Sequence, residues 1–499
     1  MYTLKETIRK IKPSKALGID TISMKTLIDC IPAIEVALLN VINASISTNT
    51  YPNSLSVSKI MPILKTGKDP LDMDSYRPIN ILNAIAKILD TVIADQIKLF
   101  LDEFNLIPYN HNGGLKGLST TSTVLVLLDM WSNMLQNNIN GVVLQLDQSA
   151  AYDMVSHVIL VDKLKILGFD KHTIKFMESY LDNRQQIVEI DGKQSSMKLI
   201  GPNSTIQGSV LAGILYLLYT LDLPAYFHDK VNKPKEDIAS NEATVITFVD
   251  DTNSTIKEKM NSELIDTMKS NLKQTEEYTS QNELLLNAKK TKVFAITKIP
   301  TIANKLILPS TDPLNPIRDS QQINMLGITI DKSLKMNYHI AQGKSSLINQ
   351  LNFRLNVLKK LVKVSDLNFS KQLANAIFHS KLLYGIEAWG LAPVYLINKI
   401  QVLQNKAARI VQGVKSRNLD TNTLIRNMKW LKIYDLIKYR ISCLIHQIIH
   451  TKKPFYLYEI LITNNSINTR NNLGFKFGIK PNNIGKTQFT KNKILFQSL

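Results

Sequence analysis

Cysteine is scarce in this chain, which has only Cys30 and Cys443 among its 499 residues. A disulfide framework and a zinc site both need several cysteines at short spacings, so the sequence excludes both and fits a reducing compartment. Long apolar runs are also missing. The N-terminus lacks the apolar core of a signal peptide, and the longest apolar stretch elsewhere, Val210–Leu221, is too short to cross a bilayer. We therefore expect an intracellular protein, nuclear or cytoplasmic, that is neither secreted nor in a membrane.

Acidic residues are few relative to basic ones, 41 against 60, which gives a formal net charge of +19. A solubilising surface explains some charges but not a bias this strong toward one sign. Nucleic acid is therefore the favoured partner. A hydrophobic content of 44% and a charged content of 20% are typical of a globular protein, and the length predicts two or three domains. No internal repeat and no coiled-coil segment is apparent.

The stretch Ala243–Ile256 is the most informative part of the sequence, and the other segments are interpreted in relation to it. An apolar, β-branched run stops at Asp250 and Asp251, and a second β-prone run follows at once, which predicts a hairpin with two acids at its bend. A further acid, Asp147, ends the apolar run Gly141–Leu146. If these strands lie side by side, the carboxylates converge. Such a cluster of like charges is costly unless a metal ion neutralises it, so we expect a cation site.

Hydrophobic periodicity and turn residues predict the other elements. A second hairpin should turn at Asp191-Gly192. A loop at 65–70 holds two lysines beside a glycine and could cradle phosphate, although a solvated turn is the more common outcome. The expected helices are Ile31–Ile46, Ala84–Phe100, Val124–Gln136 (capped within 119–121), Val158–Leu167 (stopped by Gly168), Leu211–Leu221, Asn261–Gln281 and His339–Val364. The basic surface of the last helix either follows a phosphate backbone or is simply solvated. Residues 228–242 are expected to form a polar loop.

Together these motifs resemble the reverse transcriptases of non-LTR (LINE-type, jockey- and CR1-like) retrotransposons. The matching segments follow the order of that family: KIMPILKTGKDPLDMDSYRPINILNAIAKILD, QLDQSAAYDMVSH, SYLDNRQQIVEIDG, TIQGSVL, FVDD, LNAKKTKV and MLGITID. The segments KLLYGIEAWGLAP and IQVLQNKAARI resemble the region that follows the polymerase in those elements, and they argue against a bacterial intron-type enzyme. Any one motif is weak, but seven in the right order are specific.

The resemblance implies an α+β right-hand fold, with fingers near 59–135, a palm with an antiparallel sheet near 140–298 and a helical thumb after about 335. The expected domains are an N-terminal extension (1–58), fingers and palm (59–298), a thumb-like region (299–420) and a C-terminal helical region with a tail (421–499). It also implies an RNA-directed DNA polymerase that acts on an RNA template, a DNA primer or target DNA, and deoxynucleoside triphosphates. The oligomeric state stays open.

The resemblance further assigns the site residues. Asp147, Asp250 and Asp251 match the acids that hold two Mg²⁺ ions, for which Mn²⁺ can substitute. The positions implied to contact the nucleotide are Arg77 and Lys65 at the triphosphate, Tyr152 as the aromatic residue that rejects a ribose 2′-hydroxyl, and Gln207 and Gly208 beside the nucleotide and template. Lys290 or Lys292 lies where the family has a basic residue near the leaving pyrophosphate. Seen alone, Arg77 would more often be a surface ion pair and Tyr152 a packed ring.

Some positions depart from the family pattern. Gln148 stands where a hydrophobic residue is usual, Ala212-Gly213 where Gly-Pro is usual, and Asn112-Gly113-Gly114 where His-Gly-Phe is usual. None of these removes an expected metal ligand. They motivate an alternative, a catalytically inactive nucleic-acid-binding remnant of such a polymerase. Neither an endonuclease nor a C-terminal zinc knuckle is expected in this sequence, which suggests a fragment of a longer protein.

Overall fold

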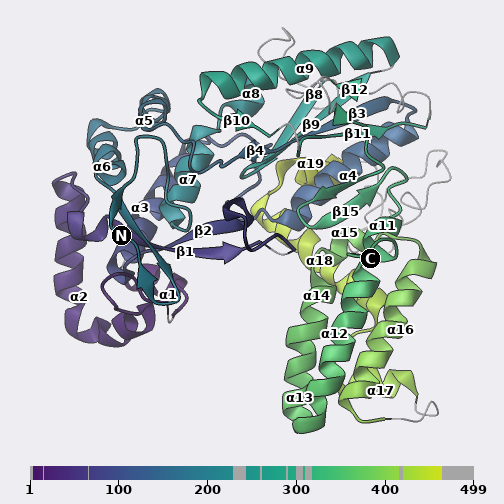
Figure 1. The fold of residues 1–499 in the computed structure, drawn as a ribbon. Coiled ribbons are helices and arrows are strands. Elements are labelled where there is room, and N and C mark those ends of the chain that lie inside the picture. Colours follow the sequence, from purple (N-terminus) through teal and green to yellow (C-terminus); the bar gives the residue numbers. More distant parts are fainter. Residues whose placement is uncertain are drawn as a thin grey trace, which may run out of the picture. The chain divides into compact units, whose positions relative to one another are not determined.

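The computed structural model describes residues 4–14, 16–65, 67–228, 243–258, 261–287, 290–298, 307–308, 317–414 and 420–463. It is a mixed α/β protein (Figure 1), and its residues fall into two compact units. Unit 1 comprises Met1–Gly114, Asp147–Lys233 and Asn271–Asn287, and unit 2 comprises Leu115–Leu146, Pro234–Ser270 and Ala288–Leu499. The chain therefore passes between the units several times. The expected loop at 228–242 lies outside the described residues except for His228, and so does the tail beyond residue 463.

Unit 1 has a mixed sheet with the order β2-β1-β5-β6, and β7 also pairs with β5. Strand β1 pairs antiparallel with β2 and parallel with β5. Helix α3 packs on α7, and α5 packs on both α6 and α7. The elements are α1 (Leu4–Lys10), α2 (Met24–Ser47), β1 (Val57–Leu64), β2 (Tyr76–Ile81), α3 (Ala84–Glu103), β4 (Gln148–Ser149), α5 (His157–Ile166), α6 (Lys171–Leu181), β5 (Gln185–Ile190), β6 (Lys193–Gln194), β7 (Lys198–Leu199), α7 (Val210–Tyr219), α8 (Leu223–His228) and β10 (Leu285–Leu286).

Unit 2 is built on an antiparallel sheet with the order β11-β3-β9-β8. Helix α9 (Asn261–Gln281) starts in unit 2 and ends in unit 1. The other elements are α4 (Thr120–Gln136), β3 (Asn140–Leu146), β8 (Ala243–Phe248), β9 (Asp251–Glu258), β11 (Lys292–Ile296), β12 (Ile307–Leu308), β13 (Ile317–Arg318), β14 (Gln322–Met325), β15 (Ile328–Asp331), α11 (Asn337–Ile340), α12 (Leu347–Leu361), α13 (Leu367–Ala374), α14 (Ser380–Leu383), α15 (Ile386–Trp389), α16 (Val394–Val411), α17 (Thr421–Asn427), α18 (Ile433–Thr451) and α19 (Phe455–Thr463).

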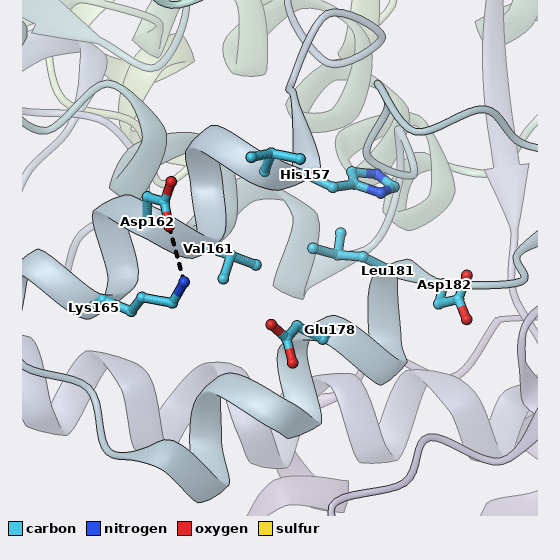
Figure 2. A pocket seen from close by; sticks show the side chains of 8 residues that line it. His157, Val161, Asp162, Lys165, Glu178, Leu181 and Asp182 are labelled. Carbon is cyan, nitrogen blue, oxygen red and sulfur yellow. Dashed lines mark hydrogen bonds and ion pairs between the residues drawn. The ribbon is translucent and has the colours of Figure 1, made fainter.

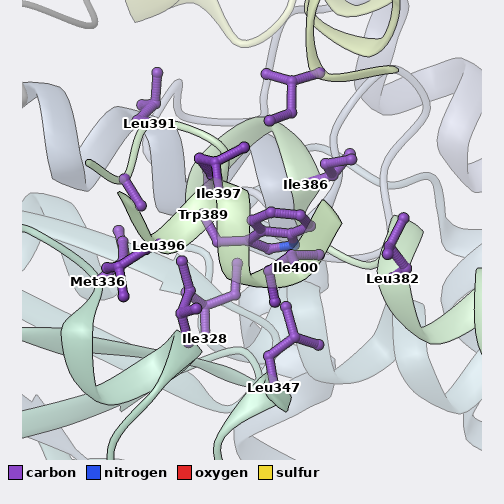
Figure 3. Packing of buried hydrophobic residues seen from close by; sticks show 14 of the residues in the cluster. Ile328, Met336, Leu347, Leu382, Ile386, Trp389, Leu391, Leu396, Ile397 and Ile400 are labelled. Carbon is purple, nitrogen blue, oxygen red and sulfur yellow. The ribbon is translucent and has the colours of Figure 1, made fainter. Parts of the chain in front are cut away.

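The core of unit 2 joins this sheet to the C-terminal helices. Residues Val142, Val143 and Leu144 of the inner strand β3 are fully buried, and α4 packs against β3 and β11. Figure 3 shows the helical part of the same core, where the fully buried Trp389 lies among aliphatic side chains that include Ile400. Helices therefore pack against the sheet whose strands lead to Asp250 and Asp251.

Most expected elements are confirmed, with some changes at their ends. Ser119 caps α4 through a capping box with Ser122, and Gly168 follows α5 with φ +84°. The predicted helix over His339–Val364 is wrong: a short helix, α11, ends at Ile340 and α12 begins only at Leu347, capped by Ser346. Gly343, with φ +86°, lies in the break. The leucine stripe, Leu347 to Leu361, lies wholly within α12, so it gives no support to a helix over residues 341–346.

By length and composition, two described helices could cross a membrane, whereas the sequence led us to expect none. The first, Val210–Phe227, spans α7 and most of α8; 72% of its residues are buried, so it belongs to the core of unit 1. The other, Met24–Ser47, is only 17% buried.

Candidate functional site

The predicted hairpin forms, but the expectation that both acids lie at its bend is wrong, because Asp251 is already the first residue of β9. Strands β8 and β9 pair antiparallel, and Phe248 lies opposite Asp251. Val249 and Asp250 alone make the turn. Val249 has φ +58°, a conformation that a β-branched residue adopts only under strain. Asp250 is exposed at the tip, while Asp251 begins β9 and is half-buried. The two acids therefore differ in environment, and Asp250 is the more accessible.

Strand β3 is a direct neighbour of this hairpin. It pairs with β9 along its whole length, with Leu146 opposite Thr252, and this confirms the expected side-by-side arrangement. On its other side β3 pairs with β11, where Lys292 lies opposite Gln145. One end of the sheet therefore carries the acidic turn, the last residue of β3 and Lys292. The side chains of Lys290 and Lys292 are both exposed.

Asp147, the residue after Leu146, belongs to unit 1. Its backbone carbonyl accepts a hydrogen bond from the Asn287 amide at 2.8 Å, next to the short pairing of β4 with β10. Asp250 and Asp251 belong to unit 2. Within the described part of the chain, no group of three or more His, Cys, Asp or Glu side chains is placed to hold a metal ion. The three-acid metal site thus stays a prediction.

In unit 1, the two basic residues expected at the triphosphate share one end of the β1–β2 ribbon. Arg77 lies opposite Ile63, and the Lys65 amide donates to the Ser75 carbonyl at 2.8 Å. The Lys65 ammonium also donates to the Asp74 carbonyl at 2.8 Å. The Arg77 side chain is exposed, and the backbone there is extended as part of β2.

The Gln207-Gly208 turn lies against this same ribbon. Strand β2 is at the edge of its sheet, and its Asn80 amide donates to the Gln207 carbonyl at 2.9 Å. Gly208 has φ +121°, and a Cβ there would lie 2.8 Å from the Asn80 carbonyl oxygen. Only glycine permits so close an approach of the two backbones. The structure therefore brings Gln207 and Gly208 to the strand that carries Arg77.

Tyr152 joins the same group of residues. Its carbonyl accepts from the Thr205 amide at 2.7 Å, two residues before Gln207. Its ring lies 5.1 Å from that of Tyr216 on α7, whose hydroxyl donates to the Gln148 side chain. Gln148, a departure from the family pattern, thus holds the residue that packs on Tyr152. Five of the predicted site residues, from Lys65 to Gly208, thus lie on elements of unit 1 that contact one another.

Sequence reasoning missed several residues that shape this site. Asn80 acts through its backbone, which leaves no sequence signal. Asp90 and Ser209 are bonded to each other beside the Gln207-Gly208 turn, since the Ser209 hydroxyl donates to Asp90 Oδ2. Both left a detectable signal: Asp90 is a carboxylate among the apolar residues of a helix, and Ser209 directly precedes an apolar helix as N-cap residues do.

A surface pocket in unit 1 lies away from the predicted site residues. It has a volume of about 340 Å³ and is lined by α5 and α6, with His157, Asp162, Lys165 and Glu178 among its residues (Figure 2). Lys165 forms an ion pair with Asp162 at 2.9 Å. None of the predicted site residues lines this pocket, so its presence does not bear on their roles.

Comparison with known proteins identifies the family of this chain. A profile of the family described as reverse transcriptase (RNA-dependent DNA polymerase) matches residues 63–330, more than half of the chain, and the chain therefore belongs to that family. The matched range contains every predicted site residue.

Similar proteins come from mobile elements. The chain is 28% identical over 418 residues to the RNA-directed DNA polymerase from mobile element jockey of Drosophila funebris, which covers 82% of this chain and 43% of that protein. It is 27% identical over 441 residues to the jockey polymerase of Drosophila melanogaster, covering 87% and 46%. The chain thus spans less than half the length of these curated relatives.

Proposed function

We propose that this chain is an RNA-directed DNA polymerase of a non-LTR retrotransposon, which copies RNA into DNA. Membership of the reverse transcriptase family and similarity to the jockey polymerases support the reaction class. The observation that carries the proposal is the register of the unit 2 sheet. It puts the Asp250 turn at the end where β3 runs out, one residue before Asp147.

In this proposal Asp147, Asp250 and Asp251 hold two Mg²⁺ ions. Their carboxylate oxygens are the hard ligands that Mg²⁺ prefers, and the two at the hairpin are rigidly held by a strand and a two-residue turn. Bound there, divalent ions would make the primer 3′-oxygen a better nucleophile and neutralise the charge of the leaving pyrophosphate. The exposure of Asp250 leaves its oxygens open to a ligand.

The unit 1 residues would bind the incoming nucleotide. The Arg77 guanidinium, exposed on β2, suits a bidentate grip on the triphosphate, and Lys65 lies at the same end of the ribbon. Gln207 and Gly208 offer an amide and an open backbone beside that strand. Tyr152 is held by its carbonyl and by ring packing, as a residue that discriminates against a ribose 2′-hydroxyl needs to be.

Lys290 or Lys292 would meet the leaving pyrophosphate, since both are exposed and Lys292 opens β11 at the acidic end of the sheet. Fingers, palm and thumb would follow the ranges expected from the sequence. The net charge of +19 suits an RNA template and a DNA primer or target as partners. Within the cell the protein would act in the nucleus or cytoplasm.

Primer extension on an RNA template with Mg²⁺ tests the proposal. Asp250→Asn removes a charged metal ligand and should lower the rate about a hundredfold or more, since metal charge stabilisation is worth several kcal/mol. Asp191→Asn is the matched control, because Asp191 also lies in a two-residue hairpin turn, between β5 and β6. It should retain full activity. Equal activity of the two variants would refute the assignment of Asp250.

The competing function is a nucleic-acid-binding remnant without catalysis. The basic charge supports it as well as it supports the polymerase, and the motif departures at Gln148 and Ala212-Gly213 favour it. A remnant would bind template–primer with an affinity that falls steeply with salt, yet add no nucleotide. The wild-type lane of the same assay separates the two functions.

A further inference from the structure

A carboxylate is buried in unit 1 at the packing interface of α3 and α7. Asp90 of α3 is 1% exposed, and its neighbours Ile88 and Leu89 are fully buried apolar residues. The Ser209 hydroxyl donates to Asp90 Oδ2 at 2.5 Å. Ser209 is also the N-cap of α7, and its oxygen accepts from the Leu211 amide at 3.1 Å. Asp90 is therefore joined directly to the start of α7.

The rest of the carboxylate's surroundings is polar and equally buried. The Tyr51 hydroxyl donates to Asp90 Oδ1 at 3.0 Å, and the Tyr180 hydroxyl contacts Ser209 Oγ at 3.2 Å. The Arg184 guanidinium lies 4.3 Å from the Tyr180 ring and 5.0 Å from the Tyr51 ring. Burial raises the pKa of Asp90, while Arg184 and the hydroxyls of Ser209 and Tyr51 oppose that rise.

Such a group is an expensive way to stabilise a core. Removing a carboxylate from water costs several kcal/mol, and an apolar side chain of similar size often stabilises as well or better. What the carboxylate does supply is a specific contact: it accepts one hydrogen bond from Ser209, the N-cap of α7. Ser209 directly follows Gln207 and Gly208.

The turn is thus fixed on two sides. Asn80 holds it from the strand side, through the 2.9 Å hydrogen bond to the Gln207 carbonyl and the close approach to Gly208. Asp90 holds it from the helix side through Ser209.

We propose that Asp90 is a positioning residue, which acts through Ser209 to set the place of the Gln207-Gly208 turn for the incoming nucleotide. This rests on the proposed function, which puts that turn beside the nucleotide and template. Asp90 itself touches no substrate. A displacement of about 1 Å in a group that positions substrate can lower the reaction rate about a hundredfold. Loss of the hydrogen bond between Ser209 and Asp90 should therefore have a measurable effect on the reaction.

The test uses four variants of the whole chain. Asp90→Asn and Ser209→Ala weaken or remove the link, and Ser209→Thr keeps the hydroxyl. Tyr51→Phe is the matched control, because it removes the other hydrogen bond to the same carboxylate and leaves the Ser209 contact. Two quantities are measured: amide hydrogen exchange at Asn80, which reports the bond to Gln207, and KM for deoxynucleotide in primer extension.

We expect Asp90→Asn and Ser209→Ala to speed exchange at the Asn80 amide about tenfold, the effect of losing one hydrogen bond. They should raise KM about tenfold with kcat changed far less, because the turn contributes to nucleotide binding. Ser209→Thr, which keeps the hydroxyl, should leave both values near wild type. Tyr51→Phe should also leave both near wild type, while it lowers the free energy of unfolding.

A purely structural role predicts the opposite pattern. Asp90→Asn and Tyr51→Phe would then lose stability alike, with Asn80 exchange and KM unchanged, and this result overturns the proposal. If Asp90→Asn does not fold, the Ser209→Ala and Ser209→Thr pair decides. If the wild-type chain adds no nucleotide, the proposed function fails. The Asn80 exchange then decides the positioning role alone, since it needs no catalysis.

Discussion

Gly208 is the residue whose replacement tests the geometry of the unit 1 site most directly. A Cβ at this position would lie 2.8 Å from the backbone oxygen of Asn80, and φ is +121°, a value that L-residues rarely adopt. The backbone strain in Gly208→Ala should cost about 1–3 kcal/mol. Displacement of the Asn80–Gln207 hydrogen bond should add about 1 kcal/mol. We expect a total loss of about 2–4 kcal/mol of unfolding free energy.

Gly213 in the same segment offers the control. It lies within α7, its φ is not positive, and a Cβ there would meet nothing within 4 Å. Gly213→Ala should therefore stabilise the chain by about 0.5–1 kcal/mol through helix propensity. Urea unfolding of both variants measures the difference, and primer extension should fail only for Gly208→Ala. Equal stability and activity of the two variants would refute the claim that β2 and the Gln207-Gly208 turn are in contact.

Three further predictions concern stability. Burial lowers the pKa of His111 from 6.5 to about 4. As pH falls, His111 is therefore protonated in the unfolded chain before it is protonated in the folded one. About 3 kcal/mol of the free energy of unfolding should be lost between pH 6.5 and pH 4. His111→Gln should flatten this pH dependence of the urea midpoint only in part, because His339 is shifted in the same direction. Arg440→Met leaves the Glu387 carboxylate, 4% exposed, without its ion pair, and should cost about 2 kcal/mol. Adding Glu387→Gln should recover part of that loss in a double-mutant cycle, and full additivity would contradict the pairing. Trp389→Ala should cost about 3–5 kcal/mol by leaving a cavity, and a loss below 1 kcal/mol in urea would show that this core is loosely packed.

The acidic hairpin illustrates what local sequence predicts well. Two β-prone runs separated by a short polar break have few alternatives to pairing with each other, and strands β8 and β9 do so with a two-residue turn. The break between Ile340 and Leu347 illustrates the opposite case. The leucines that predicted the long helix, Leu347 to Leu361, all lie in α12, so their spacing is no evidence for a helix before Leu347, where the backbone turns at Gly343.

The sequence by itself determined the order of the motifs, the strand that ends at Asp147, the hairpin of Asp250 and Asp251, and through them the family. These are local or ordered features, so periodicity, turn chemistry and composition suffice to recognise them. Only the tertiary structure decided that the Asn80 amide donates to the Gln207 carbonyl and that the Ser209 hydroxyl donates to Asp90. Those contacts join residues more than 100 positions apart, and they depend on how α3, α7 and β2 pack. The amino-acid sequence indicates that packing only weakly, because many different sequences would bury the same surface area.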